Sequence, residues 1–385
     1  MIECSMAWRG ASLDVNGSWR PCCRYAQPNQ QMQMKTPYLK DSGGNLNSLH
    51  NSDHMIALRN ALSNDQRVNE CKWCWDEEDA GIKSYREIMN EIVSKQKIKI
   101  DYTNPIAESP VYLDLKLNNV CNLKCRMCGP VASSMIQKEW ELIDSTYKGD
   151  SYWKEYKIVN TENQESFIEW LPNVFRITIT GGDPFVGKEN RDLVKLISDS
   201  GYASKIKLDF NTNGMFMPKS LLNILSKFRE VEISFSIDDV GERLTYQRHG
   251  ADLKTIIDNW NAIPDNSVFK KSIVSTINSY NIWYYIDAHK ELKQLTDNIR
   301  YDFVHNPMHL NISCLPLEIK NILITKYTKA NDAFWDKIIS VLQLDQKNRI
   351  IDFLNDTERL DELRNENFTR VFPEFASELM KHGWL

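Results

Sequence analysis

The stretch that decides the fold runs from residue 111 to residue 128 and reads VYLDLKLNNVCNLKCRMC. Its first seven residues alternate in character and are rich in strand formers, which predicts a β-strand. Cys121, Cys125 and Cys128 follow at the spacing C-x3-C-x2-C. Ligands of parallel α/β proteins gather on the loops that follow strand ends. We therefore expect an active site on this cysteine loop.

Three cysteines cannot occupy all four iron corners of a [4Fe-4S] cluster, so one iron would be left open for a small molecule. The alternatives are a share in a zinc site, or simply buried thiols. Zinc sites usually come as two paired knuckles of cysteine or histidine, and no fourth ligand lies near these three. The spacing therefore favours an open iron–sulfur cluster.

The region around this loop alternates strand-like and helix-like segments. Strands are expected at 111–118, 174–180, 205–211, 231–237, 269–277 and 298–304, with helical patterns between them, for example at 190–200, 218–228 and 253–262. Such alternation implies βαβ units and a mostly parallel sheet. Between the first two strands, residues 133–173 are expected to form one helix and a polar insertion around 147–164.

Several motifs stand in order at the ends of these strands, and together they resemble the radical S-adenosylmethionine (SAM) superfamily. C-x3-C-x2-C is similar to its cluster motif, and GGDP at 181–184 resembles its GGEP turn, with Asp183 in place of the usual Glu. TNG at 212–214, SFSID at 234–238 and RHG at 248–250 resemble three further motifs. The resemblance covers about residues 110–310 and implies a partial (β/α)6 TIM-type barrel.

The resemblance also implies roles for these residues, beside plainer alternatives. Gly181 and Gly182 would let the backbone approach SAM, and Asp183 would accept from its ammonium group or only serve the turn. Thr212 and Asn213 would meet the ligand, or else cap a turn or the following helix. Ser236 and Asp238 would bind the ribose hydroxyls of SAM, or else cap a helix. Arg248 would pair with the SAM carboxylate, or else lie on a surface helix.

A second cysteine set lies near the N-terminus. Residues 1–80 hold five of the nine cysteines, with Cys4, Cys22, Cys71 and Cys74 as candidate ligands and Cys23 as a spare or as the true partner in place of Cys22. Residues 15–18, VNGS, predict a hairpin turn between short strands. Four thiolates close a site completely, whether for zinc or for a four-iron cluster.

This second pattern resembles the Twitch and SPASM domains, which carry auxiliary [4Fe-4S] clusters beside radical SAM cores. No further cysteines follow Cys74 at the spacing of a second SPASM cluster, so the single-cluster Twitch form fits better. One departure is the order, because such a domain usually follows the core and here precedes it. A structural zinc knuckle is the alternative.

Composition excludes some classes of function. The net charge is −5 and the pI about 5.9, without the basic surplus of nucleic-acid binders. The sequence contains no apolar run of 18 residues, so no membrane-spanning helix is expected. The first residues do not resemble a signal peptide. Nine cysteines in such a chain indicate a reducing, cytoplasmic location.

The expected organisation is an auxiliary cluster domain at 1–80, a linker helix and loop at 81–109, a radical SAM core at 110–310 and a helical C-terminal extension at 311–385. The resemblance implies an oxidoreductase or modifying enzyme that cleaves SAM reductively to a 5′-deoxyadenosyl radical. The radical would take hydrogen from a peptide or small polar substrate. An electron donor such as flavodoxin or ferredoxin is expected, and no catalytic side chain is assigned. The alternatives are a non-catalytic metal-stabilised regulatory protein and a zinc-dependent nucleic-acid-binding protein.

Overall fold

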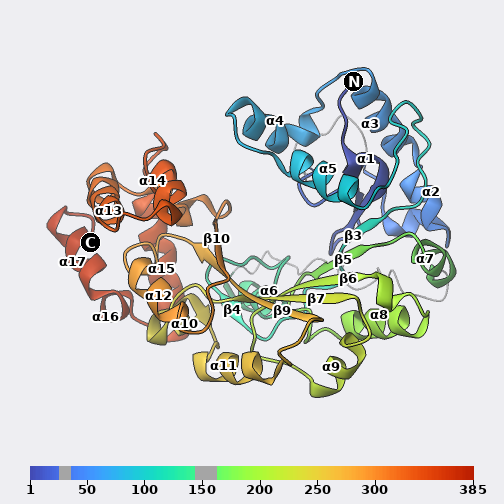
Figure 1. The fold of residues 1–385 in the computed structure, drawn as a ribbon. Helices are drawn as coiled ribbons and strands as arrows, with labels where there is room; N and C mark the ends of the chain where they lie inside the picture. Colours follow the sequence, from blue (N-terminus) through green and yellow to red (C-terminus); the bar gives the residue numbers. More distant parts are fainter. Residues whose placement is uncertain (26–35, 144–162) are drawn as a thin grey trace.

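One open sheet of eight strands organises the described part of the computed structural model, which comprises residues 1–25, 36–143 and 163–385 (Figure 1). The strand order is β10-β9-β7-β6-β5-β3-β1-β2. Six of the strands are β3 (Tyr112–Lys116), β5 (Arg176–Thr180), β6 (Lys207–Thr212), β7 (Glu230–Ser236), β9 (Phe269–Ile277) and β10 (Ile299–Phe303). All six pair in parallel. The sequence-based expectation of a partial barrel is confirmed, with the sheet left unclosed.

The alternation of side chains explains why these segments form strands. In β5 the isoleucines Ile177 and Ile179 are fully buried, whereas the alternating residues are half-buried. Register aligns Ile177 with Leu113, Leu208 and Val231 of neighbouring strands, so one apolar layer crosses the sheet. Each such side chain contributes about 1.5–3 kcal/mol by burial.

Helices cover this apolar face. Figure 1 shows α8 (Lys188–Asp199), α9 (Lys219–Leu225) and α11 (Leu253–Ala262) on one side of the sheet. The opposite face carries charged residues, for example Arg176 of β5, which donates to Asp209 of β6 at 2.5 Å. The sheet therefore has one apolar face against helices and one polar face on the opposite side.

The N-terminal region adds two strands that the sequence did not predict as part of this sheet. β1 (Gly10–Leu13) pairs in parallel with β3, and β2 (Trp19–Arg20) pairs antiparallel with β1. The hairpin turn expected between them is present, with Gly17 at φ 78° and the Asp14 amide donating to the Ser18 carbonyl at 3.1 Å. Residues near the chain start thus extend the core sheet by one parallel and one antiparallel strand.

The N-terminal helices lie over the polar face (Figure 1). They are α1 (Ser5–Arg9), α2 (Leu46–His50), α3 (Asp53–Ser63), α4 (Lys72–Asp79) and α5 (Tyr85–Lys95). The helix α5 lies where a linker helix was expected, and Ser84 and Glu87 cap it reciprocally. At the far edge of the sheet, the ring of Trp73 in α4 contacts the ring of His305, which follows β10, with centroids 5.3 Å apart. The N-terminal region therefore reaches both edges of the open sheet.

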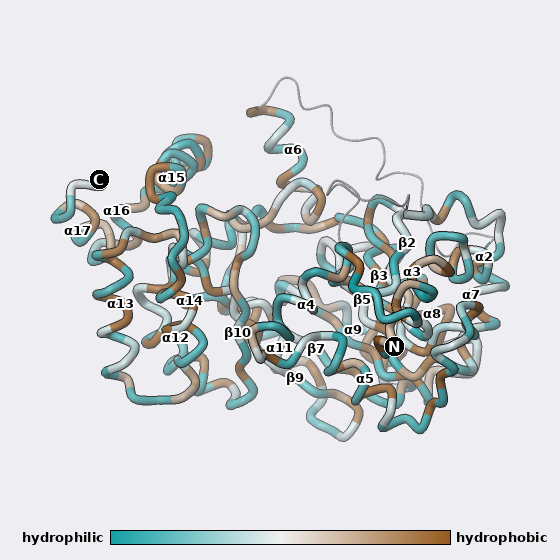
Figure 2. The backbone as a smooth tube through the Cα atoms, turned by 90° about the horizontal axis from the view of Figure 1, so that it is seen from above, coloured by the Kyte–Doolittle hydropathy of each residue, from teal (hydrophilic) through white to brown (hydrophobic). Residues whose placement is uncertain are grey.

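The C-terminal region is helical, as expected. Its helices are α13 (Leu317–Lys329), α14 (Asp336–Leu342), α15 (Ile350–Arg364), α16 (Phe368–Val371) and α17 (Pro373–Lys381). Figure 2 shows them beyond β10, on the side away from the N-terminal helices.

The remaining elements are short. The helices are α6 (Ser134–Ile143), α7 (Gln164–Trp170), α10 (Gly241–Gln247) and α12 (Tyr285–Leu292), and a two-stranded ribbon joins β4 (Lys124–Cys125) to β8 (Arg248–His249). Short 3-10 helices are η1 (Leu39–Ser42), η2 (Asn69–Cys71), η4 (Ala203–Lys205), η5 (Met308–Leu310), η6 (Ile312–Cys314) and η7 (Ala333–Trp335). Most of the polar insertion expected around 147–164 lies outside the described residues. Within the described ranges, none of the helices is both long and apolar enough to cross a membrane.

Candidate active site

The cysteine loop, residues 121–128, follows β3 and is held by a short ribbon. Its strand β4 pairs with β8 so that Cys125 faces Arg248 in register. The Arg126 amide donates to the Gln247 carbonyl at 2.8 Å, and the Ser133 hydroxyl donates to the Leu123 carbonyl at 2.8 Å. The three cysteines are therefore fixed at the carboxyl end of the first core strand.

A cavity of about 350 Å³ opens at this end of the sheet. Six of the eight residues predicted for SAM line it together with the three cysteines: Gly181, Gly182, Thr212, Asn213, Ser236 and Arg248. These six positions come from the ends of three strands, β5, β6 and β7, and from β8. The ordered motifs of the sequence are thus brought to one site.

Asp183 is placed differently from its expected role. It is buried and does not line the cavity. Its carboxylate accepts from the Thr212 hydroxyl at 2.7 Å, from the Asn213 amide at 2.8 Å and from the Phe185 amide at 3.0 Å. Burial raises the pKa of this carboxyl group, and the three donors oppose that rise. The geometry favours a role in joining the ends of β5 and β6 over a contact with the SAM ammonium.

Asp238 also lies outside the cavity wall, fully buried behind Arg248. The Arg248 guanidinium donates to both its carboxylate oxygens, at 2.7 and 3.0 Å. A third donor is the Thr276 amide at 2.7 Å. Asp238 therefore orients Arg248 and has no free face toward the ribose position expected for it.

Arg248 points its remaining nitrogen at the cysteine loop, with Nη1 3.8 Å from the Cys125 sulfur. Although burial disfavours its charge, Asp238 and Cys125 raise the pKa of Arg248, so it stays cationic. A bidentate fork to the SAM carboxylate was expected. In the structure, Nε and Nη2 of Arg248 donate to Asp238 instead, and Nη1 lies beside the Cys125 sulfur.

The two glycines of the turn serve packing between loops. Gly181 has φ 85° and Gly182 φ 51°, which favour glycine. A Cβ on Gly182 would lie 2.2 Å from the Val120 carbonyl oxygen, and one on Gly181 2.7 Å from that of Asn118. The close approach expected toward SAM is thus made to the backbone that leads into the cysteine loop.

The surroundings shift the pKa values of the three thiols, upward for Cys121 and Cys125 and downward for Cys128. Burial raises the pKa of Cys121 to about 11. The pKa of Cys128 is lowered because the Cys125 thiol donates to it and, against the effect of burial, because Arg248 is near. Asn213 adds a donor, with its side-chain nitrogen 3.7 Å from the Cys121 sulfur. Thiolate ligands of an iron–sulfur cluster would find compensating donors here.

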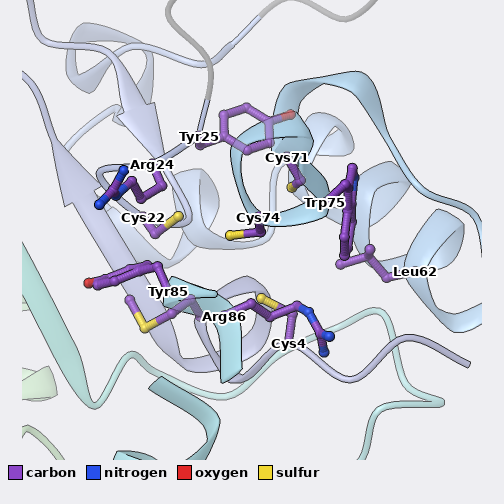
Figure 3. A pocket seen from close by; sticks show the side chains of 11 residues that line it. Cys4, Cys22, Arg24, Tyr25, Leu62, Cys71, Cys74, Trp75, Tyr85 and Arg86 are labelled. Carbon is purple, nitrogen blue, oxygen red and sulfur yellow. The ribbon is translucent and has the colours of Figure 1, made fainter. Parts of the chain in front are cut away.

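The second cysteine set converges in the N-terminal region (Figure 3). Cys4, Cys22, Cys71 and Cys74 line one largely apolar pocket. Figure 3 shows the sulfur atoms of Cys22 and Cys74 pointing toward each other. Burial raises the pKa of all four thiols, to about 11 for Cys4, so the neutral form is favoured until a cation is bound.

Cys23 is not among the residues that line this pocket. Its thiol lies beside Asp114 of β3 and Tyr85 of α5, and burial first, then Asp114, raises its pKa to about 11. Of the two adjacent cysteines, Cys22 is the one that joins the set. All nine cysteines are free thiols. In the described ranges, no three His, Cys, Asp or Glu side chains are grouped closely enough to hold a single metal ion.

Several cavity residues were not predicted. Asp14 and Val15 enter from the hairpin after β1, and Lys116 comes from the end of β3. The Lys116 ammonium lies 3.8 Å from the Asp14 carboxylate. Alternation in 112–116 could have placed Lys116 on the polar face. No pattern could have placed Asp14, because its position depends on the long-range pairing of β1 with β3.

Comparison with known proteins agrees with this site. Residues 115–293 match the family model of the radical SAM superfamily. This segment contains the cysteine loop, both glycines of the turn, and Arg248. Residues 115–293 are therefore a radical SAM domain.

Solved structures give weaker likenesses. One is anSMEcpe with bound AdoMet, at 19% identity and TM-score 0.43, covering 64% of this chain and 62% of that chain. Another is Streptococcus suis SuiB bound to S-adenosylmethionine, at 17% identity and TM-score 0.35, covering 72% and 58%. SuiB bound to the precursor peptide SuiA gives 16% identity, TM-score 0.35 and coverage of 82% and 67%. The chain thus spans about three fifths of the length of anSMEcpe. No curated protein matches.

Proposed function

We propose that this protein is a radical SAM enzyme with one auxiliary cluster, acting on a peptide or a small polar molecule. The family match supports SAM-dependent radical chemistry. The observation that carries the finer proposal is one cavity that joins the three loop cysteines to the motif residues at the ends of β5, β6 and β7 and in β8. A [4Fe-4S] cluster with SAM would supply reductive cleavage to a 5′-deoxyadenosyl radical, and the protein positions and shields that chemistry.

The residues of the chain divide into three tasks in this proposal. Cys121, Cys125 and Cys128 hold the cluster and leave one position open. Arg248, fixed by Asp238, and Asn213 place donors beside the sulfur atoms. Gly181, Gly182, Thr212 and Ser236 line the remaining space for SAM.

Two further residues of the cavity wall are suited to a polar substrate. Lys116 and Asp14 lie there and form an ion pair of 3.8 Å. The Lys116 side chain is 28% exposed, so its ammonium is open to a ligand. A peptide backbone or a polar metabolite offers the matching groups.

For the N-terminal site we propose an auxiliary [4Fe-4S] cluster on Cys4, Cys22, Cys71 and Cys74, within a Twitch-like region of residues 1–80. The apolar walls and the nearby Arg86, itself paired with Glu78 at 2.9 Å, suit an anionic cluster. The electron donor would be a flavodoxin or ferredoxin, and the cytoplasm is the expected location.

Metal analysis after anaerobic reconstitution tests this proposal. The wild type should bind about eight iron atoms, four per cluster. The Cys121/Cys125/Cys128→Ala triple variant and the Cys22→Ala variant should each lose up to about half. Cys23→Ala and Cys314→Ala are matched controls, because neither thiol lines a cysteine pocket, and both should retain the full content.

Function is tested on the same samples by the release of 5′-deoxyadenosine from SAM under a strong reductant. The wild type should release it and the triple variant should not. Zinc without iron in the anaerobic wild type would refute the radical SAM proposal and leave the zinc-dependent alternative. Full iron loading without any SAM cleavage would favour the regulatory alternative.

A further inference from the structure

Arg126 stands inside the cysteine loop, between Cys125 and Cys128, yet its side chain is not part of the cavity wall. The side chain is fully buried and reaches the C-terminal region instead. Its Nη2 donates to Asp361 and to Glu366, both at 2.5 Å, across more than 200 residues of sequence. A buried arginine in a metal-ligand loop therefore has its partners in another region of the chain.

Contacts from the core hold the same guanidinium in place. It lies 3.7 Å from the centre of the Tyr246 ring, and Nε donates to the Tyr246 carbonyl at 3.1 Å. The Tyr246 hydroxyl donates in turn to Asp361 at 2.6 Å. A planar fork that stacks on a ring and binds two carboxylates has one geometry, which lysine does not reproduce.

The segment 361–366 also holds the neighbouring strand β8. His249 is bonded to Glu366, with Nδ1 2.6 Å from the carboxylate. On the far side of the loop, Arg364 donates to Glu139 of α6 at 2.6 Å, and Lys124 of β4 donates to Glu139 at 3.1 Å. The three cations Lys124, Arg126 and Arg364 are matched by the three carboxylates Glu139, Asp361 and Glu366. The described contacts thus clamp both strands of the small ribbon.

The ribbon of β4 and β8 connects these contacts to the cysteines. Cys125 is the chain neighbour of Arg126, and the Arg126 amide is bonded to Gln247, the residue before Arg248. Arg248 in turn reaches the Cys125 sulfur. Consecutive Cα atoms are 3.8 Å apart, so a displaced Arg126 moves Cys125 with it.

We infer that Arg126 is a positioning residue for the core cluster, and that the C-terminal segment 361–366 sets the geometry of the cysteine loop through it. The inference rests on the proposed function, because it concerns the cluster assigned to that loop. It gives the C-terminal helices a part in the reaction centre, although none of their residues lines the cavity.

Two kinds of substitution test the inference on the reconstituted full chain: Arg126→Gln within the loop, and the double change Asp361→Asn with Glu366→Gln outside it. The readouts are the Kd for SAM and the midpoint potential of the SAM-sensitive cluster signal in electron paramagnetic resonance. Both variants should weaken SAM binding, by about the ten- to hundredfold that losing a partner beyond the metal ligands costs in metal affinity or activity. Both should shift the potential in the same direction.

If the charges acted directly on the cluster, the two variants would shift its potential in opposite directions, because they change the local charge with opposite sign. Opposite shifts of the potential with unchanged SAM affinity would overturn the inference, as would wild-type values in both. Leu379→Ala changes a buried residue of α17, outside the segment 361–366. It controls for general destabilisation and should keep wild-type affinity. If Arg126→Gln does not fold, the double variant decides. A wild type without any SAM-sensitive cluster would instead refute the proposed function.

Discussion

Asp183 illustrates how one side chain couples two neighbouring strand ends. Its carboxylate is shared among Thr212, Asn213 and Phe185, so the turn after β5 and the end of β6 are fixed together. Asn213 then presents its side-chain nitrogen to Cys121 and to Asn122. The effect of Asp183 on the site therefore passes through Asn213.

We predict that Asp183→Ala lowers the free energy of unfolding by about 2–4 kcal/mol, because the buried donors that now bond the carboxylate lose their acceptor. Asp183→Glu should also be less stable than the wild type, since an extra methylene in a filled site costs about 1–3 kcal/mol. Denaturant unfolding of the three proteins measures both effects.

Calorimetric titration with SAM completes the comparison. Both variants should bind SAM more weakly than the wild type, in step with their loss of stability. A glutamate variant with undiminished SAM affinity and nearly normal stability would contradict this, and would return Asp183 to direct contact with the ammonium group.

The sequence predicted which residues lie at the site but not the orientation of their side chains. Motifs at strand ends place side chains near one edge of a parallel sheet. Whether Asp238 faces a ligand or Arg248 depends on rotamers and on the Thr276 amide of another strand. Two of the eight positions expected at SAM are for this reason buried behind the cavity wall.

Among the elements, the turn after β5 and the cysteine loop pack backbone against backbone. The Asp183 amide donates to the Val120 carbonyl at 2.8 Å, and Gly182 leaves no room for a side chain against Val120. The turn therefore supports the start of the loop that carries the cysteines.

We predict that Gly182→Ala lowers stability by roughly 2–4 kcal/mol, from a strained φ and a clash with backbone that cannot give way. It should also reduce the iron bound at the core site. Gly129→Ala is the matched control one residue after the last loop cysteine, because its Cβ would meet open space, and it should stay within about 0.5 kcal/mol. Equal unfolding midpoints and equal iron contents in the two variants would disprove this account of the turn.

The core elements were predictable because local pattern and global fold agree there. Six strand ranges and the helix α5 were each marked by alternation, turn residues or caps. β1 was marked only by the hairpin turn that follows it: its four residues, Gly10–Leu13, are all buried and show no alternation. Its identity as a sheet strand comes from pairing with β3, a contact that no local pattern encodes.

Over the whole molecule, the N-terminal region is bound to the core at two distant places. β1 extends the sheet beside β3, and Trp73 meets His305 beyond β10. Between these contacts, Asp14 and Val15 enter the wall of the core cavity. The region that holds the second cysteine set is thus part of the candidate active site.

We predict that Cys71→Ala combined with Cys74→Ala makes residues 1–80 sensitive to limited proteolysis, because a small cysteine-rich unit depends on its metal for folding. SAM affinity should fall as well, since residues of the hairpin line the core cavity. Mass spectrometry of the fragments and calorimetry measure the two effects, with Cys23→Ala as the control. Wild-type protease resistance in the double variant would mean that no metal supports this region.

The pairing of β1 with β3 has a consequence for biosynthesis. β1 leaves the ribosome about 100 residues before its parallel partner β3, at 5–20 residues per second. For several seconds the nascent chain presents an unpaired strand edge beside reactive, unligated thiols, a combination prone to intermolecular association. The four cysteines of the proposed N-terminal cluster are therefore synthesised before β3 can capture the strand. On that proposal, we expect expression yield to depend on iron–sulfur supply during translation and not only after release.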